Sequence, residues 1–185
     1  KSIKRNTDNG GYSPPMFAGR VASSTNATLQ VWDKFGKIII EAAVPGMSQV
    51  DGLGIDNNDN IYVMSCMPRV NNGKKYFNWL TGTIVKVKPK KTKWYSDLSS
   101  CQVPLPKEQI PKRSPDISGY GMGNVWIEGV DWLYGGVGNC SMKIATGCCC
   151  WQQSRFTIDY FARSFAPEMD QFSVAVLDSN GNLVM

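Results

Sequence analysis

The sequence predicts an all-β protein in which one type of hairpin recurs. Short runs of apolar and β-branched residues alternate with turns that contain Gly, Asn and Asp, and helical periodicity is almost absent. With 185 residues, 42% of them hydrophobic, the chain is long enough for one domain with a sizeable core. The apolar runs are too short for a membrane-spanning helix, so we expect no membrane span.

The recurring hairpin consists of an apolar pair, an Asp, a short polar turn and a second apolar run. We expect the Asp to accept hydrogen bonds from backbone amides of its turn, while Gly or Asn adopts the left-handed conformation that a tight reversal needs. Replacing such a turn aspartate with Ala should cost about 1 kcal/mol of stability. The clear copies span residues 31–39, 54–63 and 176–184, and a weaker copy spans 129–134.

The spacing of the turn aspartates predicts how the hairpins are arranged. Asp56 follows Asp33 by 23 residues, about half of a four-stranded β-propeller blade of ~45 residues, and Asp178 follows Asp33 by 145 residues, about three blades. Residues 31–63 are therefore predicted to form two hairpins across the junction of adjacent blades. The expected fold is all-β: a single partial β-propeller domain over residues 1–185, with about three to four blades present.

The segments 31–63 and 172–184 resemble the NHL family of β-propellers, whose repeats have the form apolar-Asp-x-x-Gly-Asn-apolar-Tyr-Val. Residues 155–182 also resemble propeller segments of large secreted bacterial proteins. NHL-type propellers close with six or seven blades, which needs about 270 residues or more. The resemblance, and termini that look cut, imply part of a longer propeller. A closed four-bladed propeller of about 180 residues is the alternative.

Two irregular segments are expected between the strands. Four prolines lie between residues 103 and 117, a density that neither a central strand nor a helix tolerates, so we predict a Pro-rich surface insertion. A Cys-rich loop is expected at about 138–151. Alternating lysines within 86–93, on and after a predicted strand at 82–88, are interpreted as a solvated face. No nucleic-acid partner is expected, because no nucleic-acid-binding motif accompanies the mild net charge of +5.

Six cysteines in a chain of this length favour an oxidising compartment, so we predict an extracellular or periplasmic location. Most of the cysteines should then be oxidised, with at least one of the adjacent residues 148–150 bonded to Cys140 or to a distant cysteine. Structural disulfides, a soft-metal thiolate site and a redox-active adjacent disulfide all stay open. The disulfide candidates are Cys66, Cys101, Cys140, Cys148, Cys149 and Cys150.

The chain contains no His, so a His-dependent catalytic triad, an HExxH metal site, a c-type haem attachment and a His-ligated zinc or copper centre cannot be built from its residues. We therefore predict a non-enzymatic binding or structural module. Its expected partners are other protein chains, the remainder of its own polypeptide, or a glycan. The alternative is a hydrolase or lyase that uses Ca²⁺ and carboxylates on a propeller scaffold. We expect no cofactor, and Ca²⁺ is the alternative.

Five residues are candidates for the binding site. Asp51 and Asp131 lie beside glycine-containing segments, as expected where the innermost strands of a propeller approach its axis. We therefore predict that these two residues, rather than the turn aspartates, contact any small ligand or Ca²⁺. Glu128, with Trp126 and Trp132 nearby in sequence, is a candidate for binding or hydrolysing a glycan. The alternative is that both Trp side chains pack between blades while Glu128 pairs with a cation.

Overall fold

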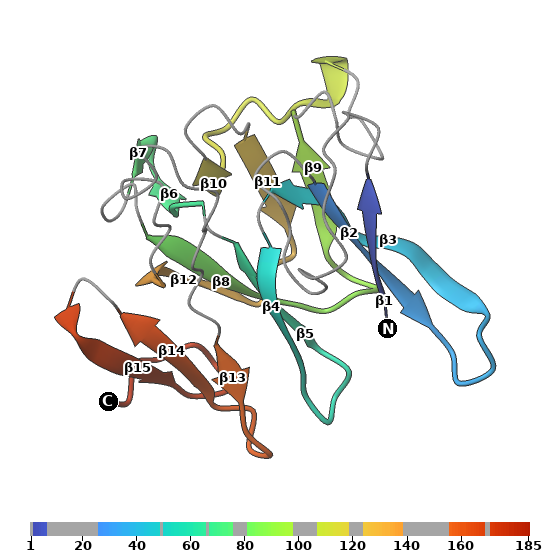
Figure 1. The fold of residues 1–185 in the computed structure, drawn as a ribbon. Helices are drawn as coiled ribbons and strands as arrows, with labels where there is room; N and C mark the ends of the chain where they lie inside the picture. The colour runs from blue at the N-terminus through green and yellow to red at the C-terminus, as the bar shows by residue number, and fades with distance from the viewer. Residues whose placement is uncertain are drawn as a thin grey trace, which may run out of the picture.

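The computed structural model places strands along most of the chain that it describes (Figure 1). Within those ranges the protein has fifteen strands and one short 3-10 helix, so the all-β prediction is confirmed. No helix in this part of the chain is long and apolar enough to span a membrane. The described residues are 2–6, 26–48, 50–65, 67–75, 81–97, 107–118, 124–138, 156–168 and 171–185.

The strands form several small antiparallel sheets. The N-terminal sheet contains β1 (Ser2–Asn6), β2 (Asn26–Trp32) and β3 (Ile38–Ser48) in that order. The central sheet has the order β12 (Trp132–Val137), β8 (Gly82–Val87), β5 (Ile61–Ser65), β4 (Val50–Ile55). The β9 sheet has the order β10 (Ile117–Ser118), β11 (Asn124–Glu128), β9 (Lys93–Ser96). The C-terminal sheet contains β13 (Thr157–Ile158), β14 (Ser164–Glu168) and β15 (Ser173–Leu177), and β6 (Val70–Asn71) pairs with β7 (Lys74–Lys75).

The central sheet is a four-stranded meander, because β4, β5, β8 and β12 are neighbours in chain order. The β6–β7 ribbon is inserted between β5 and β8, and the β9 sheet between β8 and β12. Strands β5 and β8 are buried along their whole length, including Lys86, which is only 6% exposed. The interpretation of the lysines as a solvated face is therefore wrong for Lys86, because a second layer covers each face of the sheet.

The two faces of the central sheet pack into two separate cores, as the period of two along a strand requires. Ile61 and Val85 belong to a core shared with Leu29 and Val44 of the N-terminal sheet and Ile127 of the β9 sheet. The alternate residues on the same two strands face the C-terminal sheet. This second core contains Tyr62, Met64, Ile84, Trp132, Phe156 and Leu177.

The C-terminal sheet packs closely on the central sheet, with β13 beside β4 and β14 beside β12. The approach at β4 needs glycine, because a Cβ on Gly52 would lie 2.9 Å from the ring of Phe156. Such a methyl group would be overpacked and would push the two sheets apart. The small residues that the sequence shows around Asp51 therefore serve the packing of one sheet on the next.

The C-terminal sheet repeats the order of the central sheet. Leu183 forms an antiparallel bridge with Leu177, and backbone hydrogen bonds join Val176 to Val184 and Met185. Residues 183–185 thus lie beside β15 as a fourth segment. They belong to a different sheet from β1, the first described strand.

The predicted irregular segments are described only in part. Residues 107–118 contain the 3-10 helix Lys107–Gln109 and β10, whose Ile117 is fully buried. The end of the Pro-rich segment thus contributes to a sheet and to the core. The predicted Cys-rich loop and all six cysteines lie outside the described residues.

Candidate functional site

Four hairpin turns share one hydrogen-bond pattern. In each, Oδ1 of the first Asp accepts hydrogen bonds from the backbone N–H groups two and four residues later, at 2.8 to 3.0 Å. The N–H of that Asp donates to the carbonyl of the fifth residue of the turn. The fourth residue of each turn has a positive φ. The four turns, which we call the Asp turns, are residues 33–37, 56–60, 159–163 and 178–182.

Three of the Asp turns were predicted, and their aspartates bond their own hairpin amides as expected. The weaker copy at 129–134 is not one of them, since Asp131 forms ion pairs with Lys86 of β8 and with Lys88, which follows that strand. The fourth Asp turn begins at Asp159. It was missed because its positive φ of 61° falls on Ala162, which is not a turn signal in the sequence.

A groove of about 990 Å³ lies where three of the Asp turns meet the β8–β9 turn and the β2–β3 hairpin. Asn57 Nδ2 donates to the carbonyl of Tyr160 at 3.3 Å, which joins the 56–60 and 159–163 turns beside each other at the lower edge of Figure 1. We call this depression the turn groove. It is lined by Val31, Trp32, Ile39, Ile40, the residues 56–60, Lys86, Lys88, Pro89, Lys90, Lys91, Asp131, Tyr160, Phe161, Ala162, Ser179 and Asn180.

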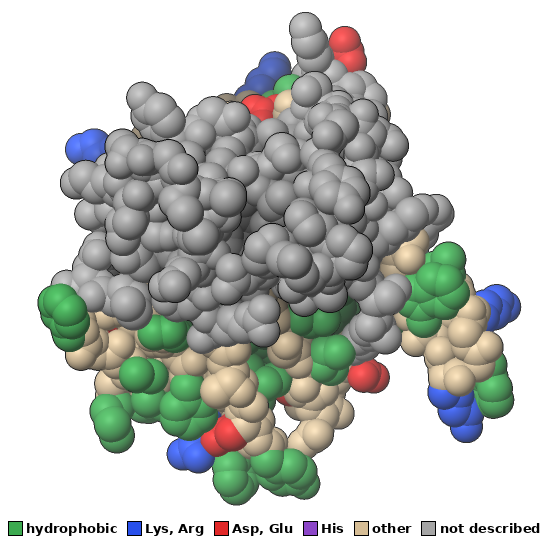
Figure 2. Space-filling view, viewed as in Figure 1, with side chains coloured by type: hydrophobic (Ala, Val, Ile, Leu, Met, Phe, Trp, Pro, Cys, Tyr) green, Lys and Arg blue, Asp and Glu red, His purple; other side chains and the backbone are tan. Residues whose placement is uncertain are grey.

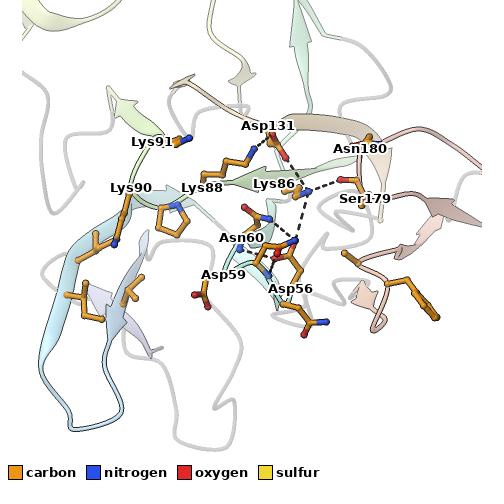
Figure 3. A pocket seen from close by; sticks show the side chains of 18 of the residues that line it. Asp56, Asp59, Asn60, Lys86, Lys88, Lys90, Lys91, Asp131, Ser179 and Asn180 are labelled. Carbon is orange, nitrogen blue, oxygen red and sulfur yellow. Dashed lines mark hydrogen bonds and ion pairs between the residues drawn. The ribbon is translucent and has the colours of Figure 1, made fainter.

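Lys86 lies at the floor of the turn groove and links two sheets (Figure 3). Its Nζ donates to the carbonyl of Ser179 at 2.7 Å, which connects β8 to the 178–182 turn of the C-terminal sheet. The same ammonium lies 3.2 Å from an oxygen of Asp131 and 3.9 Å from one of Asp56. It also lies 5.5 Å from the centroid of the Tyr62 ring. A buried cation is tolerated here because these groups replace its water.

Asp56 combines a turn function with a place in this network. Its Oδ2 accepts hydrogen bonds from Asn60 Nδ2 at 2.8 Å and from the Tyr62 hydroxyl at 3.1 Å. Burial acts to raise the pKa of Asp56, but the hydrogen bonds from Asn60, Asn58 and Tyr62 outweigh it, so the pKa lies below its ordinary value. Burial, followed by the charge of Asp56, raises the pKa of Tyr62. Asp56 is therefore ionised and Tyr62 neutral at pH 7.

Asp131 is held ionised by two lysines. The hydrogen bond from Lys88, at 2.9 Å, lowers the pKa of Asp131 most; burial opposes this, and Lys86 adds a further lowering. The Asp131 backbone N–H donates to the carbonyl of Lys86 at 3.0 Å, which fixes this pairing. The carboxylates of Asp56 and Asp131 thus neutralise Lys86 and Lys88.

These carboxylates do not fit a Ca²⁺ ion. The oxygens of Asp56 already accept four hydrogen bonds, from two backbone amides, Asn60 and Tyr62. The ammonium of Lys86 lies between Asp56 and Asp131 and would repel a second cation. Within the described residues, no group of three or more His, Cys, Asp or Glu side chains is placed to hold a metal.

Trp132 and Asp131, two of the predicted site residues, lie together at this network. The Trp132 indole N–H donates to the carbonyl of Ser179 at 3.1 Å, so Lys86 and Trp132 share one acceptor. The Trp132 ring packs edge-to-face against Tyr62, with centroids 5.7 Å apart. Trp132 is buried, so it supports the groove from beneath.

Two other predicted site residues, Trp126 and Glu128, do not line the turn groove. Trp126 and Glu128 lie on β11, in the β9 sheet. The Trp126 indole N–H donates to the carbonyl of Arg113 at 2.9 Å, and Glu128 accepts a hydrogen bond from the Tyr95 hydroxyl at 3.1 Å. The backbone of Asp51 belongs to β4, but its side chain lies outside the described residues.

Sequence reasoning missed Lys86, Lys90, Lys91 and the exposed pair Tyr160 and Phe161. Lys86 carried one signal: it is the single charged residue in β8, a strand that is apolar on both of its faces. A lone lysine in such a strand is expected to have a carboxylate partner. The exposed residues Lys90, Lys91, Tyr160 and Phe161 carried no signal in the sequence, because they line the groove only as a result of which turns lie side by side in the fold.

Comparison of the chain with protein-family models, with curated proteins and with solved structures finds no match.

Proposed function

We propose that this chain is an exported segment of a β-propeller that acts as a non-enzymatic binding module, with the turn groove as its binding surface. The central sheet and the C-terminal sheet support the propeller proposal. Each is a meander in chain order, and β4 packs beside β13 while β12 packs beside β14. Successive blades of a propeller are antiparallel meanders that pack one on the next, so this arrangement is consistent with two blades. The resemblance of the hairpins to NHL repeats points the same way.

The observation that carries the binding function is that the turn groove is lined by turn residues whose side chains are free of the turn's own hydrogen bonds. The first aspartate of each Asp turn and four of its five backbone N–H groups form hydrogen bonds within the turn. Side chains such as Asn58, Tyr160 and Asn180 are exposed at the tips and line the groove. Surface turns on a rigid β scaffold commonly carry binding residues.

The enzyme alternative has weaker support. A general acid needs a pKa close to the working pH, whereas the pKa values of Asp56 and Asp131 lie below their ordinary value. Both groups therefore stay as carboxylates and serve as partners of Lys86. A binding function needs no proton transfer and is consistent with this arrangement.

The binding proposal is tested by screening the full chain against arrays of glycans and of extracellular proteins. A variant with Asn58→Ala, Tyr160→Ala and Asn180→Ala should lose the binding that the wild type shows. A control variant with Glu108→Ala, Lys112→Ala and Phe172→Ala, exposed residues that do not line the groove, should keep it. Binding that survives the first variant, or the absence of any binding, would contradict the proposal.

Export rests on the cysteine content alone and has its own test. Protein purified from its natural source is denatured and its free thiols are titrated. Few thiols should be recovered, since an oxidising compartment leaves most of the six cysteines in disulfides. Recovery of five or six thiols would exclude disulfides and return the cysteines to the metal-binding interpretation.

A further inference from the structure

We propose that the turn groove binds an acidic polysaccharide, a chain of sugar rings that carry carboxylates. This inference rests on the proposed binding function and names its ligand class. The groove combines three features: a wall with two lysines that have no carboxylate partner among the described residues, an exposed aromatic pair, and exposed side-chain amides.

The positive charge lies on the β8–β9 turn, at Lys90 and Lys91. Both side chains are exposed and line the groove, and Figure 3 shows them on the side opposite Ser179 and Asn180. Within the described part of the chain neither has a carboxylate partner, whereas Lys86 and Lys88 are paired. The lining of the groove contains four lysines and three aspartates, Asp56, Asp59 and Asp131, so the lysines are in excess and favour an anionic ligand.

The aromatic pair lies at the tip of the 159–163 turn. Tyr160 is 79% exposed and Phe161 is 69% exposed, and their rings form an edge-to-face pair with centroids 5.6 Å apart. The guanidinium of Arg163 lies 5.4 Å from the centroid of the Phe161 ring. Figure 2 shows hydrophobic and charged side chains gathered at this lower edge of the molecule. Neighbouring exposed aromatic rings indicate an interaction site, and the apolar face of a sugar ring stacks on such rings.

The third feature is a set of exposed side-chain amides that line the groove. Asn57 and Asn58 are exposed on the 56–60 turn, and Asn180 is exposed on the 178–182 turn. A side-chain amide offers two N–H donors and a carbonyl acceptor, so it can bond hydroxyl groups, which are both donors and acceptors. Amides, aromatic faces and lysines together match the hydroxyls, ring faces and carboxylates of an acidic polysaccharide.

An extended acidic peptide is matched less well. A peptide that binds along a backbone needs unpaired N–H and C=O groups from its host. In each Asp turn the N–H groups of the first, third, fourth and fifth residues donate within the turn, which leaves at most one N–H per turn for a peptide. The size and open form of the groove also suit a polymer that passes through it rather than a single enclosed ring.

The test is isothermal titration of the full chain with hexamers of galacturonate and of mannuronate, and with the same hexamers after chemical reduction of their carboxylates. We expect the acidic hexamers to bind at least about 10-fold more tightly than the reduced ones, and the difference to shrink in 0.5 M salt because surface charges are screened. Equal affinity for acidic and reduced hexamers would overturn the proposal.

Matched variants locate the site. The double change Lys90→Gln and Lys91→Gln should weaken binding of the acidic hexamers about 10-fold without affecting the reduced ones, and Tyr160→Ala should weaken both. The controls Lys112→Gln and Phe172→Ala remove an exposed lysine and an exposed aromatic ring that do not line the groove, so they should bind as the wild type does. The folding of each variant is checked by thermal unfolding. Because the changed side chains are exposed, the unfolding midpoint should stay within a few degrees of the wild-type value.

The remaining outcomes separate this inference from the proposed function. If a poly-glutamate peptide binds in a Lys90- and Lys91-dependent manner and the hexamers do not, the polysaccharide is wrong and the binding surface stands. If binding on the arrays depends on Asn58, Tyr160 and Asn180 but no acidic ligand binds, the acidic-polysaccharide inference fails and the proposed binding function stands. If no array binding depends on the tips either, both fail.

Discussion

Two of the Asp turns have nearly the same side chains and very different surroundings. The 56–60 and 178–182 turns both begin with Asp and carry Asn two and four residues later, and in both the last Asn donates to Oδ2 of the Asp. Yet Asp56 is buried and also bonds Tyr62 and Lys86, whereas Asp178 bonds only within its own turn among the described residues. The local sequence determines the shape of the turn. The neighbouring sheet determines how much that turn contributes to stability.

The comparison is tested most strongly by removing the two aspartates. Asp56→Ala should lower the free energy of unfolding by about 3 kcal/mol, because it takes a counter-charge from buried Lys86 and leaves the Tyr62 and Asn60 donors without their acceptor. Asp178→Ala should cause a clearly smaller loss. Urea unfolding at pH 7 measures both. Equal losses would mean that the buried network adds nothing to the turn.

The fourth position of the turns gives a second contrast. Gly36 and Gly181 both have φ near +85°, but a Cβ on Gly181 would lie 2.6 Å from Trp132, while one on Gly36 meets nothing within 4 Å. Gly36→Ala should therefore cost about 1 kcal/mol from backbone strain alone, and Gly181→Ala about 3 kcal/mol because overpacking is added. The thermal midpoints of the two variants measure this. If the Gly36 variant lost as much thermal stability as the Gly181 variant, the packing of Trp132 against the 178–182 turn would be contradicted.

Acidification tests how much the ionised Asp56 and Asp131 contribute to stability. The pKa values of Asp56 and Asp131 are lower in the folded chain than the ordinary value of 3.8, so their stabilisation is complete above about pH 4 and is lost as pH falls through the lower folded values. In Asp131→Asn, the loss of unfolding free energy between pH 5 and pH 2 should be smaller than in the wild type by up to about 1 kcal/mol. Unfolding series across this range measure the difference. An unchanged acid dependence would show that Asp131 has no lowered pKa.

The smallest expected effect compares two buried serines. The Ser65 hydroxyl accepts a hydrogen bond from the Met67 amide at 3.1 Å, whereas the buried Ser164 hydroxyl has no partner in the described structure. Ser65→Ala should destabilise by about 1 kcal/mol, and Ser164→Ala should be neutral or stabilising by less than about 1 kcal/mol. Chemical unfolding separates the two signs. Destabilisation by Ser164→Ala comparable to that of Ser65→Ala would show that its hydroxyl is bonded.

The parts of the fold that sequence could predict are those encoded within a few residues. The turns at Asp33, Asp56 and Asp178 were predictable because Asp, Asn and Gly have direct conformational roles there. The turn at Asp159 was not, because Ala162 adopts its positive φ without a local preference for it. Tertiary packing overrides propensity at that position.

The candidate site could be predicted only in part, for a related reason. Asp131, one of the predicted site residues, lines the groove, yet its partner Lys86 is 45 residues earlier and is buried by a sheet formed much later in the chain. Trp126 and Glu128 went elsewhere because β11 pairs with β9 rather than with the central sheet. Such pairings follow from long-range register, which hydrophobic periodicity does not reveal.

The hydrogen-bond pattern of the Asp turns has a consequence for protein engineering. Each turn uses its first and last residues and the backbone of those between, so the side chains of its second and third residues are not needed for the reversal. A display library could randomise these positions and generate many recognition faces on one unchanged framework, as antibody loops do. The eight positions are Lys34, Phe35, Asn57, Asn58, Tyr160, Phe161, Ser179 and Asn180.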